Sequence, residues 1–99
     1  MAKCDVYANP SGTGLLLDCQ ADLLSELTTR LVVPLLPLKK APKPARRLNP
    51  VFQIEGKSYV MATQFAATVP ARLLKNRIGS IAEHEIEIGN AIDMLLSGF

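Results

Sequence analysis

The apolar segments of this chain are short, and turn-forming residues separate them. In the first half, Val6-Tyr7 and residues 15–17 flank residues 9–14, where nearly every residue favours a turn. Further along, residues 51–54 and 58–62 flank a short turn that contains glycine. This spacing predicts two antiparallel hairpins and limits the chain to a fold built from short strands.

A third apolar run, residues 30–35, is β-branched at its centre but carries proline near its end. Pro34 and Pro37 have no N–H to donate to a strand ladder. We therefore expect the end of this run to lie at a sheet edge or a bulge. Residues 65–70 and 72–74 form shorter extended pieces.

The C-terminal residues change to a helical period. Ser80 and Glu83 have the spacing of a capping box, and Gly98 is a typical helix stop. Gly89 weakens the middle of the helix by about 1 kcal/mol relative to alanine, so we expect a close packing contact there. The apolar positions at helical spacing are Ile81, Ile88, Ala91, Ile92, Leu95 and Leu96. Short strands followed by one helix predict a single β-rich α+β domain over residues 1–99.

Composition excludes several classes of protein. With 48% hydrophobic residues and a net charge of +2, the chain does not resemble a disordered one. Its longest apolar run, residues 31–38, is too short and too rich in proline to cross a membrane. The N-terminal residues do not form a signal peptide, so we expect a cytoplasmic protein. A mean hydropathy of +0.19 over 99 residues exceeds what one small core can hide, which favours a homo-oligomer.

One segment, residues 39–47, holds five basic residues and no acidic one: Lys39, Lys40, Lys43, Arg46 and Arg47. Since the whole chain has 11 basic and 9 acidic residues, the rest holds six against nine, a balance of −3. The segment is either a solvated loop or an anchor for an acidic partner. Nucleic acid fits less well, because the segment has no aromatic residue to stack on bases and its prolines exclude a helix in a groove.

The chain has two cysteines, Cys4 and Cys19. If Val6 faces Leu17 in the first hairpin, Cys4 faces Cys19, and opposed residues lie about 4.5–5.5 Å apart at Cα, within the range of a disulfide. The alternative is two buried, reduced thiols, as is usual in the cytosol. Two cysteines and the distant His84 do not make a zinc site, so we expect no metal.

No set of residues resembles an active site, and we expect neither catalysis nor a cofactor. His84 lies among glutamates and is typical of a surface histidine, while Asp18 and Asp22 favour turn or capping roles. The tail is different, because Phe99 follows Gly98 at the end of the helix. Phe99 either packs back on the helix or presents an apolar anchor and a free carboxylate to a partner.

Several segments, in their order along the chain, then carry a family resemblance: Asp5-Val6-Tyr7, residues 17–24, residues 29–35, Leu48-Asn49-Pro50-Val51, Val69-Pro70, Asn90-Ala91-Ile92-Asp93 and Gly98-Phe99. Together they resemble the CcdB family, the toxins of plasmid and chromosomal toxin–antitoxin modules. The resemblance covers essentially the whole chain. It implies a homodimer with an SH3-like antiparallel β-barrel and a C-terminal α-helix.

The resemblance also implies a function. A dimer of the toxin lodges between the two A subunits of DNA gyrase and traps the cleaved-DNA complex, as a topoisomerase poison without catalysis of its own. The gyrase-binding positions would be Leu23, Leu24, Asp93, Leu96, Ser97, Gly98 and Phe99. A CcdA-like antitoxin with a disordered acidic C-terminal segment would remove the toxin from gyrase, and the basic residues 39–47 suit that partner.

Two departures from the family pattern bear on these expectations. Ser97 stands where the best-known member has a tryptophan that stacks on a gyrase arginine, so a cation–π contact is lost. Cys4 and Cys19 stand where other members carry phenylalanine and valine, which adds to the case for a disulfide. We also expect the helix to contribute to the dimer seam through Gly89, Ile92 and Met94.

Two alternatives remain open at this point. Endoribonuclease toxins of the MazF type share this architecture, and Arg30, Arg72 and Thr63 are the basic and polar residues available for such chemistry. The second alternative is that the chain is an inactive relative that only sequesters antitoxin. Sequence-specific binding of nucleic acid and association with a membrane are not expected.

Overall fold

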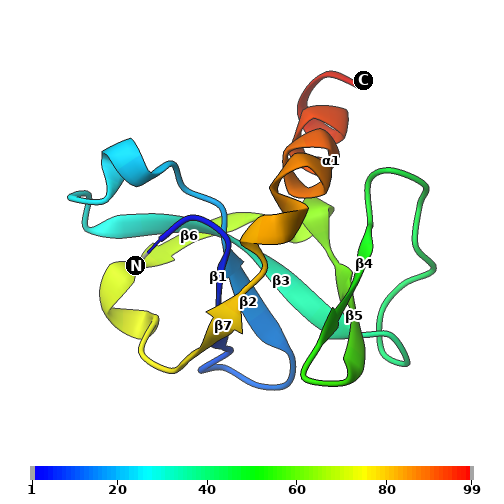
Figure 1. Ribbon diagram of the computed structural model, residues 1–99, viewed down its shortest axis with the longest axis horizontal. Helices are drawn as coiled ribbons and strands as arrows, with labels where there is room; N and C mark the ends of the chain where they lie inside the picture. Colours follow the sequence, from blue (N-terminus) through cyan, green and yellow to red (C-terminus); the bar gives the residue numbers. More distant parts are fainter. Residues whose placement is uncertain (1, 99) are drawn as a thin grey trace.

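The computed structural model describes residues 2–98, which form one antiparallel sheet, four short 3-10 turns and one α-helix (Figure 1). The strands are β1 (Asp5–Ala8), β2 (Leu15–Asp18), β3 (Thr29–Pro37), β4 (Val51–Ile54), β5 (Lys57–Met61), β6 (Ala67–Pro70) and β7 (Arg77–Ser80). The 3-10 turns are η1 (Asp22–Leu24), η2 (Thr63–Phe65), η3 (Ala71–Leu73) and η4 (Ala82–His84). The α-helix is α1 (Glu85–Ser97).

The sheet is curled, and its strands follow the order β4-β5-β3-β2-β1-β7, with β6 also paired to β3. α1 stands at one side of the curled sheet, and its C-terminal end points away from the strands (Figure 1). This is the β-rich α+β arrangement that the sequence pattern predicted, in the form of the SH3-like barrel with a C-terminal helix that the family resemblance implied.

β3 is the central strand, so the expectation of an edge or bulge is wrong for Pro34, which pairs with Leu16 of β2, whereas Pro37 lies beyond the end of the β2 pairing and has only β5 beside it. One edge of β3 pairs with β2, and the other pairs with β6 over residues 29–32 and with β5 over residues 35–37. The Pro34 carbonyl lies between these two partners and accepts the Ala62 N–H at 2.9 Å. Because the nitrogen and carbonyl of a strand residue face the same side, the missing donor of Pro34 falls at the junction of β5 and β6.

Both predicted hairpins are confirmed. In the first, Val6 pairs with Leu17, and the connecting loop ends at Gly14, whose φ is +89°. A Cβ at Gly14 would lie 2.6 Å from the Leu35 carbonyl oxygen, so this position requires glycine. The register does not extend to the cysteines, because Cys4 has a φ of +72° and its N–H donates to the Asp18 carbonyl at 2.7 Å.

The helix begins differently from the prediction and ends as predicted. Ser80 does not cap α1: its Oγ accepts the Ala82 N–H, and η4 leads into the helix at Glu85. At the other end, Gly98 adopts the left-handed conformation, and its N–H donates to the Met94 carbonyl at 3.0 Å. The close packing contact expected at Gly89 is absent from the described residues, because, its chain neighbours and the nearby backbone of its own helix aside, none of their atoms lies within 4 Å of where its Cβ would be.

Two apolar clusters lie on opposite faces of the sheet. The larger one joins the concave face to α1, through residues that include Leu17, Val33, Phe52, Met61 and Ile88. The smaller one contains Tyr7, Leu16, Val32 and Leu74. Alternation along β2 and β3 produces this division, because successive strand residues point to opposite faces. No helix among residues 2–98 is long and apolar enough to cross a bilayer.

Candidate functional site

The end of α1 carries most of the residues that the resemblance assigns to gyrase binding. Only Ile88 and Ala91 of this helix are buried, and its last turn extends beyond the strands (Figure 1). Asp93, Ser97 and Gly98 are exposed, and the Leu96 side chain is 77% exposed. Phe99 lies outside the described residues. The described positions therefore form one exposed helix end with an unusually accessible leucine.

The geometry of this end is fixed by short-range hydrogen bonds. The Ser97 Oγ donates to the Asp93 carbonyl at 3.0 Å, one turn earlier in the helix. With the Gly98 N–H bound to the Met94 carbonyl, the last turn is closed by two bonds within the helix itself. These two bonds within the helix set the direction of the last turn up to Gly98.

Leu23 and Leu24 lie in η1 and not at the helix end. Leu23 is 97% exposed and Leu24 is 50% exposed. The Gln20 Nε2 donates to the Leu24 carbonyl at 2.9 Å, and the Lys3 N–H donates to the Asp22 Oδ1 at 2.8 Å, which together hold the turn. Figure 1 shows η1 and the end of α1 as separate projections. In one chain, the candidate gyrase-binding residues therefore form two surfaces rather than one.

The basic residues lie on a long connection between β3 and β4, here called the basic strap (residues 39–47). All five of its cations are exposed, and none forms an ion pair within the described part of the chain. Asn49 fastens the end of the strap: its Oδ1 accepts the Ala45 N–H at 3.0 Å, and its Nδ2 donates to the Met61 carbonyl at 3.0 Å. The strap thus exposes five positive charges, and hydrogen bonds of Asn49 hold its C-terminal end against the sheet.

With this geometry in view, comparison with known families gives a clear result. The family model for the CcdB protein matches residues 3–98, nearly the whole chain. The chain belongs to the CcdB family. Members of this family are toxins of toxin–antitoxin modules, of the gyrase-poison type.

In this CcdB-family chain, the three residues considered for ribonuclease chemistry do not form a site. Arg30 is fully buried, and its Nε and Nη2 donate to the Asp18 Oδ2 at 2.9 and 2.6 Å. Thr63 is also fully buried, and its hydroxyl donates to the Leu48 carbonyl. Neither side chain can reach a substrate, because both are fully enclosed.

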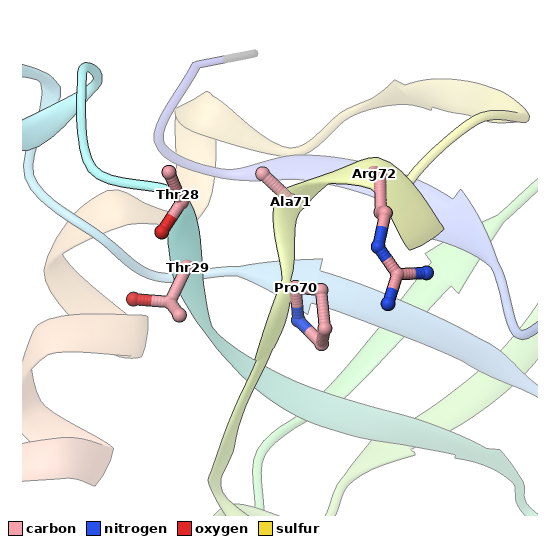
Figure 2. A pocket seen from close by; sticks show the side chains of 5 residues that line it. All are labelled: Thr28, Thr29, Pro70, Ala71 and Arg72. Atoms are coloured by element: carbon pink, nitrogen blue, oxygen red, sulfur yellow. The ribbon is translucent and has the colours of Figure 1, made fainter.

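Arg72, the third of these residues, lines a hollow of about 550 Å³ where β3 begins and β6 leads into η3. Figure 2 shows that its side chain lies on the other side of Pro70 from Thr28 and Thr29. An exposed arginine and two separate hydroxyls supply no general base for a cleavage reaction. This hollow therefore gives no support to the ribonuclease alternative.

The ion pair of Arg30 and Asp18 was not foreseen from the sequence, which gave Asp18 a turn or capping role. Asp18 does accept the Gln20 N–H at 3.1 Å, as a turn residue would, but its main partner is the Arg30 guanidinium. The only signal in the sequence was a charged residue directly before an apolar run. The pair is structural, since both side chains are fully buried.

Cys4 and Cys19 are buried free thiols. Burial raises the pKa of Cys19 to about 12, with a smaller contribution from the neighbouring Cys4, and burial also raises the pKa of Cys4. Both groups are therefore protonated near neutral pH, where a thiol is a poor nucleophile. The disulfide between them stays a prediction.

His84 contributes to the start of α1. Its Nδ1 lies 3.2 Å from the Glu87 Oε1, and its ring centre lies 4.9 Å from that of Phe52. Within residues 2–98, no group of three or more histidine, cysteine or acidic side chains is placed to hold a metal ion.

Proposed function

We propose that this protein poisons DNA gyrase, by binding the gyrase A subunit and trapping the complex of gyrase with cleaved DNA. The observation that carries the proposal is the exposed end of α1. Leu96 is 77% exposed on a turn whose direction is fixed, and this is the part of the chain that the family resemblance assigns to the target. Large apolar side chains at the centre of an interface supply much of its binding free energy.

The proposal includes a homodimer, which would bring together two copies of the helix end. Gly89, Ile92 and Met94 are all partly exposed along α1. The space beside Gly89 is open, so a second backbone can approach closely there. A symmetric contact along this part of α1 would also cover apolar surface that one small core leaves accessible.

The proposal also includes neutralisation by a CcdA-like antitoxin. Five exposed cations that form no ion pair with any acidic group of residues 2–98 attract an acidic segment, and a disordered segment can wrap around such a surface as it folds. In this proposal the protein acts in the cytoplasm, where gyrase works, and it has no catalytic step of its own.

The test mixes the purified protein with gyrase, plasmid DNA and ATP, with labelled RNA in a parallel reaction. We expect linear plasmid after treatment with detergent and protease, and intact RNA. A variant that lacks Phe99 should lose poisoning but keep its fold and its dimer, measured by circular dichroism and by sedimentation.

Three results would contradict parts of the proposal. Fragmented RNA with intact plasmid would support the ribonuclease alternative. Intact plasmid and RNA, combined with tight binding of antitoxin, would identify an inactive relative that sequesters antitoxin. Full poisoning by the folded variant without Phe99 would remove the tail from the gyrase-binding surface.

A further inference from the structure

A second surface lies at the base of the basic strap, where β3 ends beside the start of β5. A hollow of about 480 Å³ is lined there by Pro37, Leu38, Lys39, Lys40, Lys57 and Ser58, and is here called the lysine groove. The Leu38 N–H donates to the Ser58 carbonyl at 3.1 Å, and the Lys40 N–H donates to the Pro37 carbonyl at 2.9 Å. The walls of the groove are thus held by backbone hydrogen bonds.

The charge in the groove has one sign. Its three lysines are exposed, no acidic residue lines it, and none of the three forms an ion pair within residues 2–98. A hollow of about 310 Å³ at the other end of the strap is different, because it places Arg47 beside Glu87. The lysine groove therefore attracts an anionic group more strongly than this second hollow, where Glu87 offsets the charge of Arg47.

The floor of the groove is apolar. Leu38 is 48% exposed although it follows a buried strand, and Pro37 lies next to it. Lysine side chains add aliphatic stems to such a wall while their ammonium groups stay in water. A matching ligand has an apolar group that enters the groove and negative charges around it.

The basic strap continues directly from the groove and carries three more exposed cations, Lys43, Arg46 and Arg47. A small organic anion would use only the lysines of the groove, whereas an extended peptide can follow the whole strap. We infer that the lysine groove anchors one bulky apolar side chain of an acidic, extended peptide segment whose carboxylates lie along the strap. This inference rests on the proposed function in one respect, namely that the antitoxin is the natural source of the segment.

The test uses synthetic probes and the full-length protein. One fluorescein-labelled peptide consists of aspartate, glutamate and serine with a single central phenylalanine, and its matched control has serine in place of phenylalanine. Binding is followed by fluorescence anisotropy at low ionic strength. We expect the phenylalanine peptide to bind about tenfold more tightly to the wild-type protein, because its ring is removed from water.

Three variants locate the effect. Leu38→Ser should abolish the difference between the two peptides, since it removes the apolar floor. Lys57→Glu should weaken both peptides. Lys75→Glu, the same charge reversal at an exposed site between η3 and β7, should change binding much less. Circular dichroism checks that each variant is folded.

Several outcomes would overturn the inference. Equal affinity for the two peptides would show that the groove takes no apolar anchor. If Lys57→Glu and Lys75→Glu weakened peptide binding equally, the net charge of the protein, and not the groove, would account for the binding. Tighter binding of dodecanoate than of the phenylalanine peptide would identify a small-anion site, and equally tight binding of a single-stranded oligonucleotide of matched charge would identify a general polyanion surface.

The plasmid assay separates this inference from the proposed function. Leu38→Ser and Lys57→Glu should still produce linear plasmid with gyrase, because neither residue lies at the end of α1 or in η1. If the wild-type protein fails to poison gyrase but the peptide results hold, the groove stands and the proposed function falls. If the wild-type protein poisons gyrase but binds the two peptides equally well, the proposed function stands and the inference about the groove falls.

Discussion

The sheet interior and the segments that project from it use the same types of residue in opposite ways. Arg30 is fully buried and bonded to Asp18, whereas the five cations of the basic strap are exposed and unpaired within the described chain. Ile88 is fully buried, whereas Leu96 on the same helix is 77% exposed. We therefore expect substitutions in the interior to affect stability, and substitutions in the projecting segments to affect the binding that we propose.

The largest expected effect is on the buried ion pair. Arg30→Met leaves the Asp18 carboxylate buried without its counter-charge, and we expect the free energy of unfolding to fall by about 3–5 kcal/mol. Urea denaturation measures this loss. Adding Asp18→Asn to the same variant removes the unpaired charge and should restore part of the stability. A loss below about 1 kcal/mol in the single variant would mean that the pair is not structural.

Next in size is the contrast between the two ends of α1. Ile88→Ala should lower the free energy of unfolding by about 2–4 kcal/mol, because it leaves a cavity in the larger apolar cluster. Leu96→Ala should change it by less than about 0.5 kcal/mol, as is usual for exposed sites, yet should reduce the yield of linear plasmid. If Leu96→Ala destabilised the fold as much as Ile88→Ala, Leu96 would contribute to the folded core and not only to an exposed surface.

A pH dependence follows from the buried thiol. The pKa of Cys19 is raised to about 12 from its ordinary value of 9.0, so the folded protein keeps this proton while the unfolded chain releases it above pH 9. This contribution to stability is full below pH 9 and declines toward pH 12, by about 1.4 kcal/mol for each pH unit. Denaturation of the wild-type protein and of Cys19→Val at pH 8 and pH 10.5 measures it. Equal declines in both would show that other groups are responsible.

The smallest expected effect is a gain at the helix end. Ser97→Trp would supply a ring for a cation–π contact with the gyrase arginine expected from the family, worth about 0.5–1 kcal/mol at an exposed site. We expect linear plasmid at a roughly two- to fivefold lower protein concentration. Ser97→Leu adds apolar surface without an aromatic face and is the matched control. Equal gains from both variants would point to burial rather than cation–π binding.

Local chemistry in the sequence was a good guide to the first hairpin and to the end of α1, but not to the start of α1, where Ser80 precedes η4 instead of capping the helix. The pairing of Val6 with Leu17 follows from loop length and turn residues, and the left-handed cap at Gly98 follows from the glycine itself. Pro34 was misjudged, because its place in a central strand depends on where two distant strands, β5 and β6, end along β3. No local pattern contains that information.

The candidate site shows the same division. The exposure of Leu96 and of the strap cations could be expected from an apolar tail and from a short segment with five basic residues and no acidic one. The separation of η1 from the end of α1 could not be expected from the sequence, because it depends on how the sheet curls (Figure 1). The lysine groove was missed for a similar reason: Lys57 joins Leu38 and Lys39 only through the pairing of β5 with β3.

The fastening of the basic strap has a thermodynamic consequence. Asn49 holds one end and the Lys40 turn holds the other, while residues 41–44 between them make no backbone hydrogen bond to the described chain. A partner that binds the strap must then restrict its backbone torsions, at an entropic cost of about 1–2 kcal/mol for each residue ordered. Capture of the strap should be driven by enthalpy and opposed by entropy, and should therefore weaken as the temperature rises.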